Sequence, residues 1–266
     1  MKYFDAHSHV QFTAYDADRA EVLERMQNAE VGGLVVGVNF ATSEAAISLV
    51  QNIPSLWATV GLHPNDTQNS DFNVSEYEEL IQNPKVVGIG ECGLDYYRPL
   101  DVTHEVVRRQ KEVFEAHIEL AVKYEKPLMI HSRPSKGSQD AYLDTIDMLA
   151  SKKKEYGDRL KGDMHFFVGG VDEARKFLEL DFSMSYTAVL TFARDYDEVV
   201  RFLPLTHLLT ETDSPYVAPA PNRGKRNEPT AVRDVVRQMA DIRGQNEEEV
   251  REAILGNAAR IFRISL

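Results

Sequence analysis

Short runs of consecutive apolar residues alternate along this chain with stretches whose apolar positions recur every three or four residues. The runs lack polar alternation, as in Leu34–Val38, Leu56–Val60 and Val86–Gly90, which is typical of strands buried on both faces. The stretches between them, such as residues 105–124, have the spacing of amphipathic helices. This alternation predicts a parallel sheet covered by helices.

The pattern contains eight strands, each followed by helical sequence. The strands are expected at Met1–Phe4, Leu34–Val38, Leu56–Val60, Val86–Gly90, Lys126–Ile130, Leu160–Met164, Asp181–Ser185 and Leu208–Thr210. Helices are expected near residues 18–30, 42–50, 75–82, 105–124, 139–155, 171–178, 196–203, 230–243 and 246–262, with Thr42 and Asn246 as capping positions. Eight such units favour a closed (β/α)8 barrel of the TIM type, and we expect residues 1–266 to form a single α/β domain. An open doubly wound sheet is the alternative, but no glycine-rich phosphate loop follows the first strand.

Composition narrows the class of protein. The chain is 43% hydrophobic and 27% charged, which suits a substantial core, and it has no run of 18 apolar residues that predicts a membrane span. We expect no secretory signal at its start, and the single cysteine, Cys92, excludes an intrachain disulfide and suits a reducing cytoplasm. A net charge of −12 argues against broad adhesion to nucleic acid, but a phosphate in a small pocket lined by metal ions and arginines is compatible with it.

Histidines and carboxylates follow the predicted strands at the same point of several units. They are His7, His9, Glu91, His131, His165 and Asp213. In a barrel the carboxyl ends of all strands meet at one mouth, and His7 and His9, two residues apart, face the same way. Four imidazoles and two carboxylates suit Zn, Mn, Fe, Co or Ni better than Mg or Ca alone. Six ligands exceed one tetrahedral zinc, so we expect a two-metal centre with Glu91 as the bridge.

Seven short motifs give the chain a specific resemblance. They are Asp5-Ala6-His7-Ser8-His9, Gly61-Leu62-His63-Pro64, residues 88–97 (Gly-Ile-Gly-Glu-Cys-Gly-Leu-Asp-Tyr-Tyr), Ile130-His131-Ser132-Arg133, His165-Phe166, Glu211-Thr212-Asp213-Ser214-Pro215 and Asn227-Glu228-Pro229. In this order they resemble the TatD family of metal-dependent deoxyribonucleases, within the amidohydrolase superfamily. The chain departs from the family at His165-Phe166-Phe167, where the family often has His-Cys-Phe, but the ligand histidine is retained.

The resemblance implies a barrel that hydrolyses phosphodiesters at DNA ends, as an exonuclease, with two divalent metal ions (Mg, Mn, Zn, Co or Ni). His7, His9 and Asp213 resemble the ligands of one metal and His131 and His165 those of the other. Glu91 resembles the carboxylate that both share. It also implies that DNA or short nucleic-acid ends are the substrate.

Residue chemistry suggests how such a site works. A metal-activated water needs a base, and we expect Asp213 to take its proton and pass it to the leaving oxygen. Arg133 is placed to bind a phosphate through two hydrogen bonds, and Arg98 is either a second contact or a solvated surface residue. The resemblance places His63 at the mouth as a substrate contact, and a histidine held for structure is the alternative.

The remaining polar residues of these motifs are open to two readings. Asp95 and Tyr96 either frame the substrate or shape their loop. Glu211 is expected to hold a ligand histidine or an arginine. His104, His117 and His207 lie off the strand ends, and no function is assigned to them.

Two other functions remain open at this point. The same barrel and metals also serve an esterase, a lactonase or a D-aminoacyl-tRNA deacylase, because fold does not fix function. A scaffold that keeps metal only for stability is the third reading, and the complete ligand set argues against it. We expect a cytoplasmic protein without membrane contact, and both a monomer and a small homo-oligomer are compatible with the sequence.

Overall fold

Eight parallel strands follow one another around a ring in the order of the chain. The computed structural model describes residues 1–99 and 101–266. The strands are β1 (Tyr3–Ser8), β2 (Val31–Val36), β3 (Leu56–Val60), β4 (Val86–Asp95), β5 (Leu128–Arg133), β6 (Gly162–Met164), β7 (Ser183–Tyr186) and β8 (Leu208–Thr210). Each strand pairs in parallel with its chain neighbour, so the predicted TIM-type (β/α)8 fold is confirmed.

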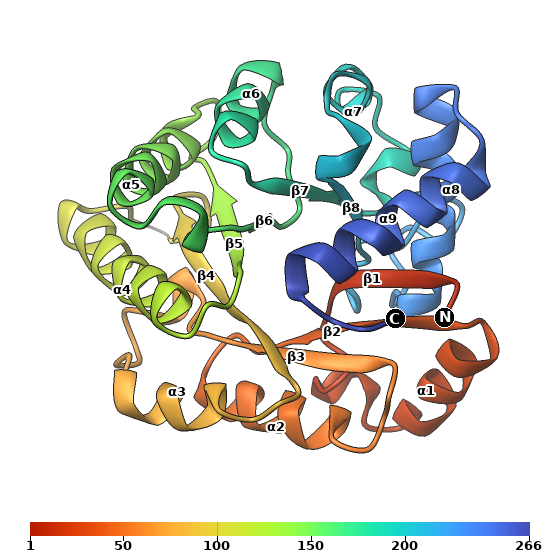
Figure 1. Cartoon of the computed structure of the whole chain (residues 1–266), viewed down its shortest axis with the longest axis horizontal. Helices are drawn as coiled ribbons and strands as arrows, with labels where there is room; N and C mark the ends of the chain where they lie inside the picture. Colours follow the sequence, from red (N-terminus) through yellow and green to blue (C-terminus); the bar gives the residue numbers. More distant parts are fainter. Residues whose placement is uncertain (100) are drawn as a thin grey trace.

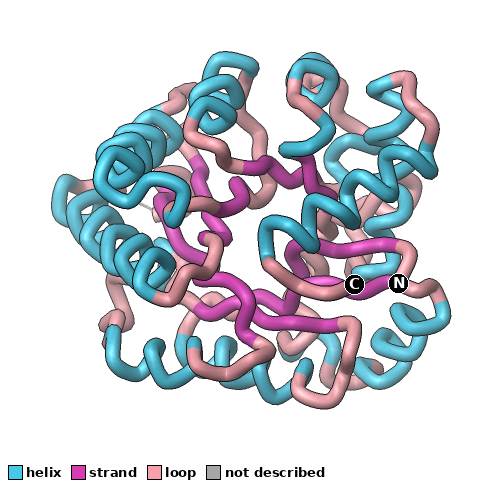
Figure 2. Tube along the Cα trace, viewed as in Figure 1, coloured by secondary structure: helices cyan, strands magenta, loops and turns pink. Residues whose placement is uncertain are grey.

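The helices are α1 (Arg19–Asn28), α2 (Phe40–Val50), α3 (Val74–Ile81), α4 (His104–Lys123), α5 (Asp140–Tyr156), α6 (Val171–Glu179), α7 (Asp197–Phe202), α8 (Val232–Arg243) and α9 (Glu247–Phe262). Helices α1 to α8 form an outer layer around this ring, and α9 lies inward of them beside β1 and β8, as Figures 1 and 2 show. The last helix, α9, packs against β1, where the Arg251 guanidinium donates a hydrogen bond to the Lys2 carbonyl over 2.9 Å. Among the described residues, none of the helices combines the length and the apolar sequence that crossing a membrane requires.

The amphipathic pattern explains which face each helix turns inward. In α4 the apolar side chains of Val113, Phe114, Ile118 and Ala121 are buried against the ring at helical spacing. Asn246 caps α9 as predicted, accepting hydrogen bonds from the Glu248 and Glu249 N–H groups.

The expected cap of α2 is wrong by three residues. Asn39 is the N-cap, and its side chain accepts the N–H of Thr42 over 3.0 Å. The Thr42 hydroxyl in turn accepts the Asn39 N–H over 3.0 Å, which is the reciprocal arrangement of a capping box.

Strands β1, β4 and β5 extend at least three residues further toward the mouth than the sequence predicted. The ladder between β4 and β5 continues through Gly93 opposite His131 to Asp95 opposite Arg133. Similarly, β1 continues to Ser8, so that His7 is part of the strand. The ligand-bearing residues of these strands are therefore fixed by backbone pairing, not carried on free loops.

The ring is joined between β8 and β1 by side chains as well as backbone. Ser8 forms a parallel bridge with Ser214, just beyond β8. The buried Asp5 carboxylate accepts hydrogen bonds from the Thr212 N–H over 2.8 Å and the Thr212 hydroxyl over 2.6 Å. This contact fixes the first strand against the segment that carries Asp213.

Candidate metal centre

The six predicted ligands converge on one carboxylate at the mouth of the barrel. Glu91, in β4, is 3% exposed and lies at the centre of the group. Its Oε2 is 3.4 Å from His7 Nε2 and 3.9 Å from His9 Nε2. Its Oε1 is 2.9 Å from His131 Nδ1 and 3.6 Å from His165 Nε2. The two oxygens of Glu91 thus face different histidines, and His63 Nε2 also lies 3.4 Å from Oε1.

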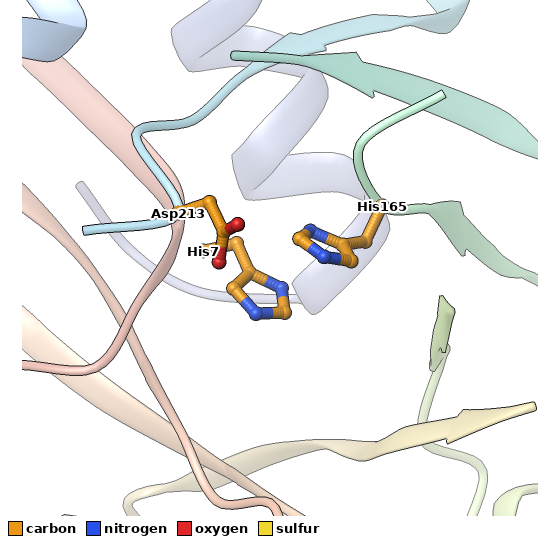
Figure 3. Close-up of side chains that lie close together, drawn as sticks. All are labelled: His7, His165 and Asp213. Carbon is orange, nitrogen blue, oxygen red and sulfur yellow. The ribbon is translucent and has the colours of Figure 1, made fainter. Parts of the chain in front are cut away.

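Asp213 lies on the same side of Glu91 as His7 and His9, the two histidines at the end of the first strand. Its Oδ1 is 3.6 Å from His9 Nε2, and its backbone N–H donates to the His7 carbonyl over 2.9 Å. His7, His165 and Asp213 come from β1, the loop after β6 and the loop after β8, and they point toward one another (Figure 3). The predicted convergence of His7 and His9 is also present, since their Nε2 atoms are 3.2 Å apart.

Neighbouring acceptors orient the rings of three histidines. His9 Nδ1 is 2.9 Å from the Val36 carbonyl oxygen and donates to it, which turns Nε2 toward Asp213 Oδ1. Burial lowers the pKa of His165, but Glu211, whose Oε1 is 2.8 Å from His165 Nδ1, raises it to about 10 overall. Glu211 therefore has the predicted position beside a ligand histidine.

His131 has a carboxylate at each ring nitrogen. Its Nε2 is 3.1 Å from the buried Asp95 Oδ2 and its Nδ1 is 2.9 Å from Glu91 Oε1, so a proton on Nε2 directed at Asp95 leaves Nδ1 as the atom that would bind a metal. The ring nitrogens that face carboxylate oxygens need positive charge at the contact, because the lone pair of a neutral imidazole and a carboxylate repel each other. Protons on the imidazoles supply this charge without metal, and divalent cations supply it when bound.

The donor set fits metal ions. His7, His9 and Glu91 form one group whose ligand atoms lie within 4.8 Å of one another, and Glu91, His131 and His165 form another. Imidazole and carboxylate together are ligands of Zn, Mn, Co and Ni. Glu91 belongs to both groups, in the position expected of a bridge.

The electrostatic surroundings keep both carboxylates ionised. Burial raises the pKa of Glu91, but the facing imidazoles of His63 and His7 and the hydrogen bond with His131 bring it well below its usual value. Burial likewise raises the pKa of Asp213, and the imidazole of His9, 3.6 Å away, together with those of His165 and His7 lowers it overall. Asp213 is therefore available to accept a proton at neutral pH.

A cavity of about 660 Å³ lies above these ligands. Its lining includes three of the four residues predicted to contact substrate, namely His63, Arg98 and Arg133. His63 Nε2 is 3.4 Å from Glu91 Oε1, and the Arg133 guanidinium carbon lies 4.0 Å from the centroid of the exposed Tyr97 ring.

Tyr96 does not lie in the mouth, in contrast to the prediction. Its side chain is 4% exposed, and its hydroxyl donates to Asp144 of α5 over 2.8 Å. Successive residues of an extended strand point to opposite faces, and β4 remains extended up to Asp95. Asp95 is turned toward His131, so Tyr96 is turned outward to the helix layer.

Two residues of the site were missed or left open by sequence reasoning. Asp95 was an open choice between substrate and loop, and the structure places it against His131 instead. Tyr216 was not considered, although it lines the cavity and its ring lies edge-on to His9 with 6.5 Å between centroids. Its place directly after the Asp213-Ser214-Pro215 segment was the available signal.

Comparisons with known proteins agree with this geometry. A family model described as TatD related DNase matches residues 4–263. The chain is 36% identical over 269 residues to YabD of Bacillus subtilis, named an uncharacterized metal-dependent hydrolase, covering 98% of this chain and 99% of that protein. It is 32% identical over 273 residues to a protein of Pantoea vagans named 3'-5' ssDNA/RNA exonuclease TatD, covering 98% and 100%. Among solved structures, the TatD homologue YjjV of Escherichia coli K12 superposes with a TM-score of 0.88 at 25% identity, covering 99% of both chains.

Proposed function

Because the chain belongs to the TatD family of metal-dependent hydrolases, we propose that it is a deoxyribonuclease that removes nucleotides from an end of single-stranded DNA. The observation that carries this proposal is the pair of histidine groups on the two oxygens of Glu91, below a cavity with two arginines in its lining. The exonuclease name of the Pantoea vagans relative supports the same substrate class.

Two divalent cations are part of the proposal. His7, His9 and Asp213 would hold one cation, His131 and His165 the other, and Glu91 both. When bound, such a pair supplies an activated water and neutralises charge on the phosphoryl group.

Asp213 acts as the general base in this proposal. Its lowered pKa keeps it ionised, so it accepts a proton from the attacking water and returns it to the leaving oxygen. It is held in place by its backbone hydrogen bond to His7 and by the adjacent Asp5–Thr212 contact. The general base therefore does not need to move before the reaction.

Arg133 binds the phosphate. Among the described residues, no carboxylate lies within salt-bridge distance of its guanidinium, so the donors remain available for a substrate. The net charge of −12 disfavours a long DNA footprint, while a single-stranded end needs only the local cations of the mouth. A cytoplasmic location, in line with the single cysteine, belongs to the same proposal.

The test is hydrolysis of a labelled single-stranded oligonucleotide by metal-stripped protein, with Mg, Mn, Co or Zn added back. We expect stepwise shortening from one end that requires added metal. Asp213→Asn, prepared in parallel, should show none, which excludes a contaminating nuclease. Absence of shortening with every metal, in protein shown to have bound them, would refute the proposal.

Removing Arg133 separates phosphodiester from acyl-ester hydrolysis. Arg133→Met should lower kcat/KM for a phosphodiester by about 10–100-fold, because a charge-assisted hydrogen-bonding pair is lost. Hydrolysis of p-nitrophenyl acetate should change little. An enzyme whose acyl-ester activity is the higher of the two, and whose phosphodiester activity survives Arg133→Met, is an esterase or a deacylase instead.

A further inference from the structure

The lining of the mouth changes character with strand order. Apart from the metal-ligand group, the described lining residues from β4, β5 and the segments after β3 and β4 are all polar or charged: His63, Asn65, Asp66, Asp95, Arg98, Ser132 and Arg133. Every one contributed by the segments after β6, β7 and β8 is apolar or aromatic: Phe166, Val168, Val189, Tyr196, Tyr216 and Val217. The six residues of this second set are called the apolar wall below. The metal centre lies between two chemically different sides.

The two sides suit different parts of a nucleic-acid strand. Both arginines of the lining, Arg98 and Arg133, are on the polar side, so a phosphate is bound there. The apolar wall offers no cation to a phosphate, but it suits the face of a base. At a strand end, further phosphates exist only on the polymer side of the scissile bond. The polymer therefore lies toward the arginines, and the released nucleotide lies toward the apolar wall.

Tyr216 is the exposed aromatic surface of this wall. It is 52% exposed, and its backbone N–H donates to the Asp213 carbonyl over 2.9 Å, which places it directly beside the general base. Tyr97 is similarly exposed at 51%, but the Arg133 guanidinium stacks on its ring. Within the described part of the chain, no lysine or arginine stacks on Tyr216.

We propose that the apolar wall is a subsite for the base of the released nucleotide, which stacks on Tyr216 without regard to which base it is. This inference rests on the proposed nuclease function. Amide, carboxylate and guanidinium groups are the side chains that distinguish base edges, and the wall has none of them. Its polar atoms are the hydroxyls of Tyr196 and Tyr216, which either donate or accept and so discriminate little.

The experiment compares two oligonucleotides that differ only in whether the terminal nucleotide to be released carries a base or is abasic. For the wild-type, metal-loaded protein we expect kcat/KM to be about tenfold lower for the abasic end, the usual effect of losing one stacked base. The four natural bases at that end should agree within about threefold. Tyr216→Ala should lower kcat/KM for the normal end toward the abasic value, and lower it much less for the abasic end.

A conservative variant and two contrary outcomes complete the test. Tyr216→Phe retains the ring and should retain the preference for the normal end, which separates stacking from hydroxyl chemistry. Equal cleavage of normal and abasic ends by the wild-type protein, or an equal loss for both ends in Tyr216→Ala, would overturn the subsite while leaving the nuclease function intact. No cleavage of either end by metal-loaded protein would instead overturn the nuclease function and the subsite together.

Discussion

Asp95→Asn should weaken metal binding by reversing the protonation of one ligand histidine. Asp95 Oδ1 accepts the backbone N–H groups of Tyr97 and Arg98, each over 2.9 Å. Oδ2 accepts the Asn65 amide over 2.9 Å and faces His131 Nε2. Hydrogen bonds from His131, Arg98 and Asn65 outweigh the effect of burial, so the pKa of Asp95 lies below its usual value and the group is an acceptor at both oxygens.

An asparagine cannot accept at both positions. Its carbonyl oxygen is needed at the Oδ1 position by two backbone N–H groups, so its NH2 group faces His131 Nε2. That nitrogen then has to accept, and the proton moves to Nδ1, the atom 2.9 Å from Glu91. Losing the residue that orients a ligand histidine typically costs about 10–100-fold in metal affinity, which is about 1.4–2.7 kcal/mol.

The assay is a metal titration of stripped protein, read by calorimetry or by competition with a chelator. Asp66→Asn is the matched control, because it removes a carboxylate from the same cavity lining that, among the described residues, has no imidazole within hydrogen-bonding distance. On a His131→Ala background, Asp95→Asn should have no further effect. Unchanged affinity in Asp95→Asn, or additive losses in the double variant, would refute the reasoning.

Three further predictions concern stability and the reaction. Thr212→Val should lower the free energy of unfolding, measured by urea unfolding, by about 1–3 kcal/mol, because the buried Asp5 carboxylate loses a donor. Thr210→Val is the control, since the buried Thr210 hydroxyl has no partner in the described chain, and its free energy of unfolding should not fall. Burial lowers the pKa of His117 to about 4, whereas its pKa in the unfolded chain is about 6.5. The neutral imidazole therefore contributes its full stabilisation above about pH 6.5, and this contribution is lost as the pH falls toward 4. Between about pH 7 and pH 5, the free energy of unfolding of the wild type should fall by about 2 kcal/mol more than that of His117→Gln. Equal slopes for the two proteins in urea unfolding would contradict this. Glu91→Gln should lower the metal stoichiometry of stripped protein, measured by elemental analysis after dialysis, and a stoichiometry equal to that of the wild type would show that Glu91 is not shared.

The periodicity of the sequence was sufficient for the barrel and for most of the ligands. Runs such as Leu34–Val38 and Leu56–Val60 are too short and too uniformly apolar for surface strands, and the structure places Leu34–Val36 in the buried strand β2 and Leu56–Val60 in β3. The spacing of His7 and His9 fixed their common direction, because a strand has a period of two residues. Neither inference required knowledge of distant contacts.

The positions that sequence reasoning missed depend on pairing between segments. The strand before Glu91 was expected to end at Gly90, so Asp95 and Tyr96 were treated as loop residues. Pairing with β5 keeps the chain extended to Asp95, and this alternation alone sends Asp95 to the mouth and Tyr96 to α5. Tyr216 follows a strand in an irregular segment, where no period predicts the direction of a side chain.

His117 shows a further contact that periodicity does not reveal. Its Nδ1 donates to the Val113 carbonyl within α4, and its Nε2 accepts the Leu62 N–H over 3.0 Å. It therefore supports the segment that carries His63, although it lies far from any strand end in the sequence. The partner is 55 residues away, and only the folded chain brings the two together.

Anomalous diffraction from crystals of the protein loaded with Mn tests the two-metal centre most directly. We predict two peaks on either side of the Glu91 carboxylate, one contacted by His7, His9 and Asp213 and the other by His131 and His165. Asp95 should lie against the nitrogen of His131 that is not bound to metal. A single peak, or a peak among His63, Asp95 and His131 in place of the predicted pair, would contradict the account.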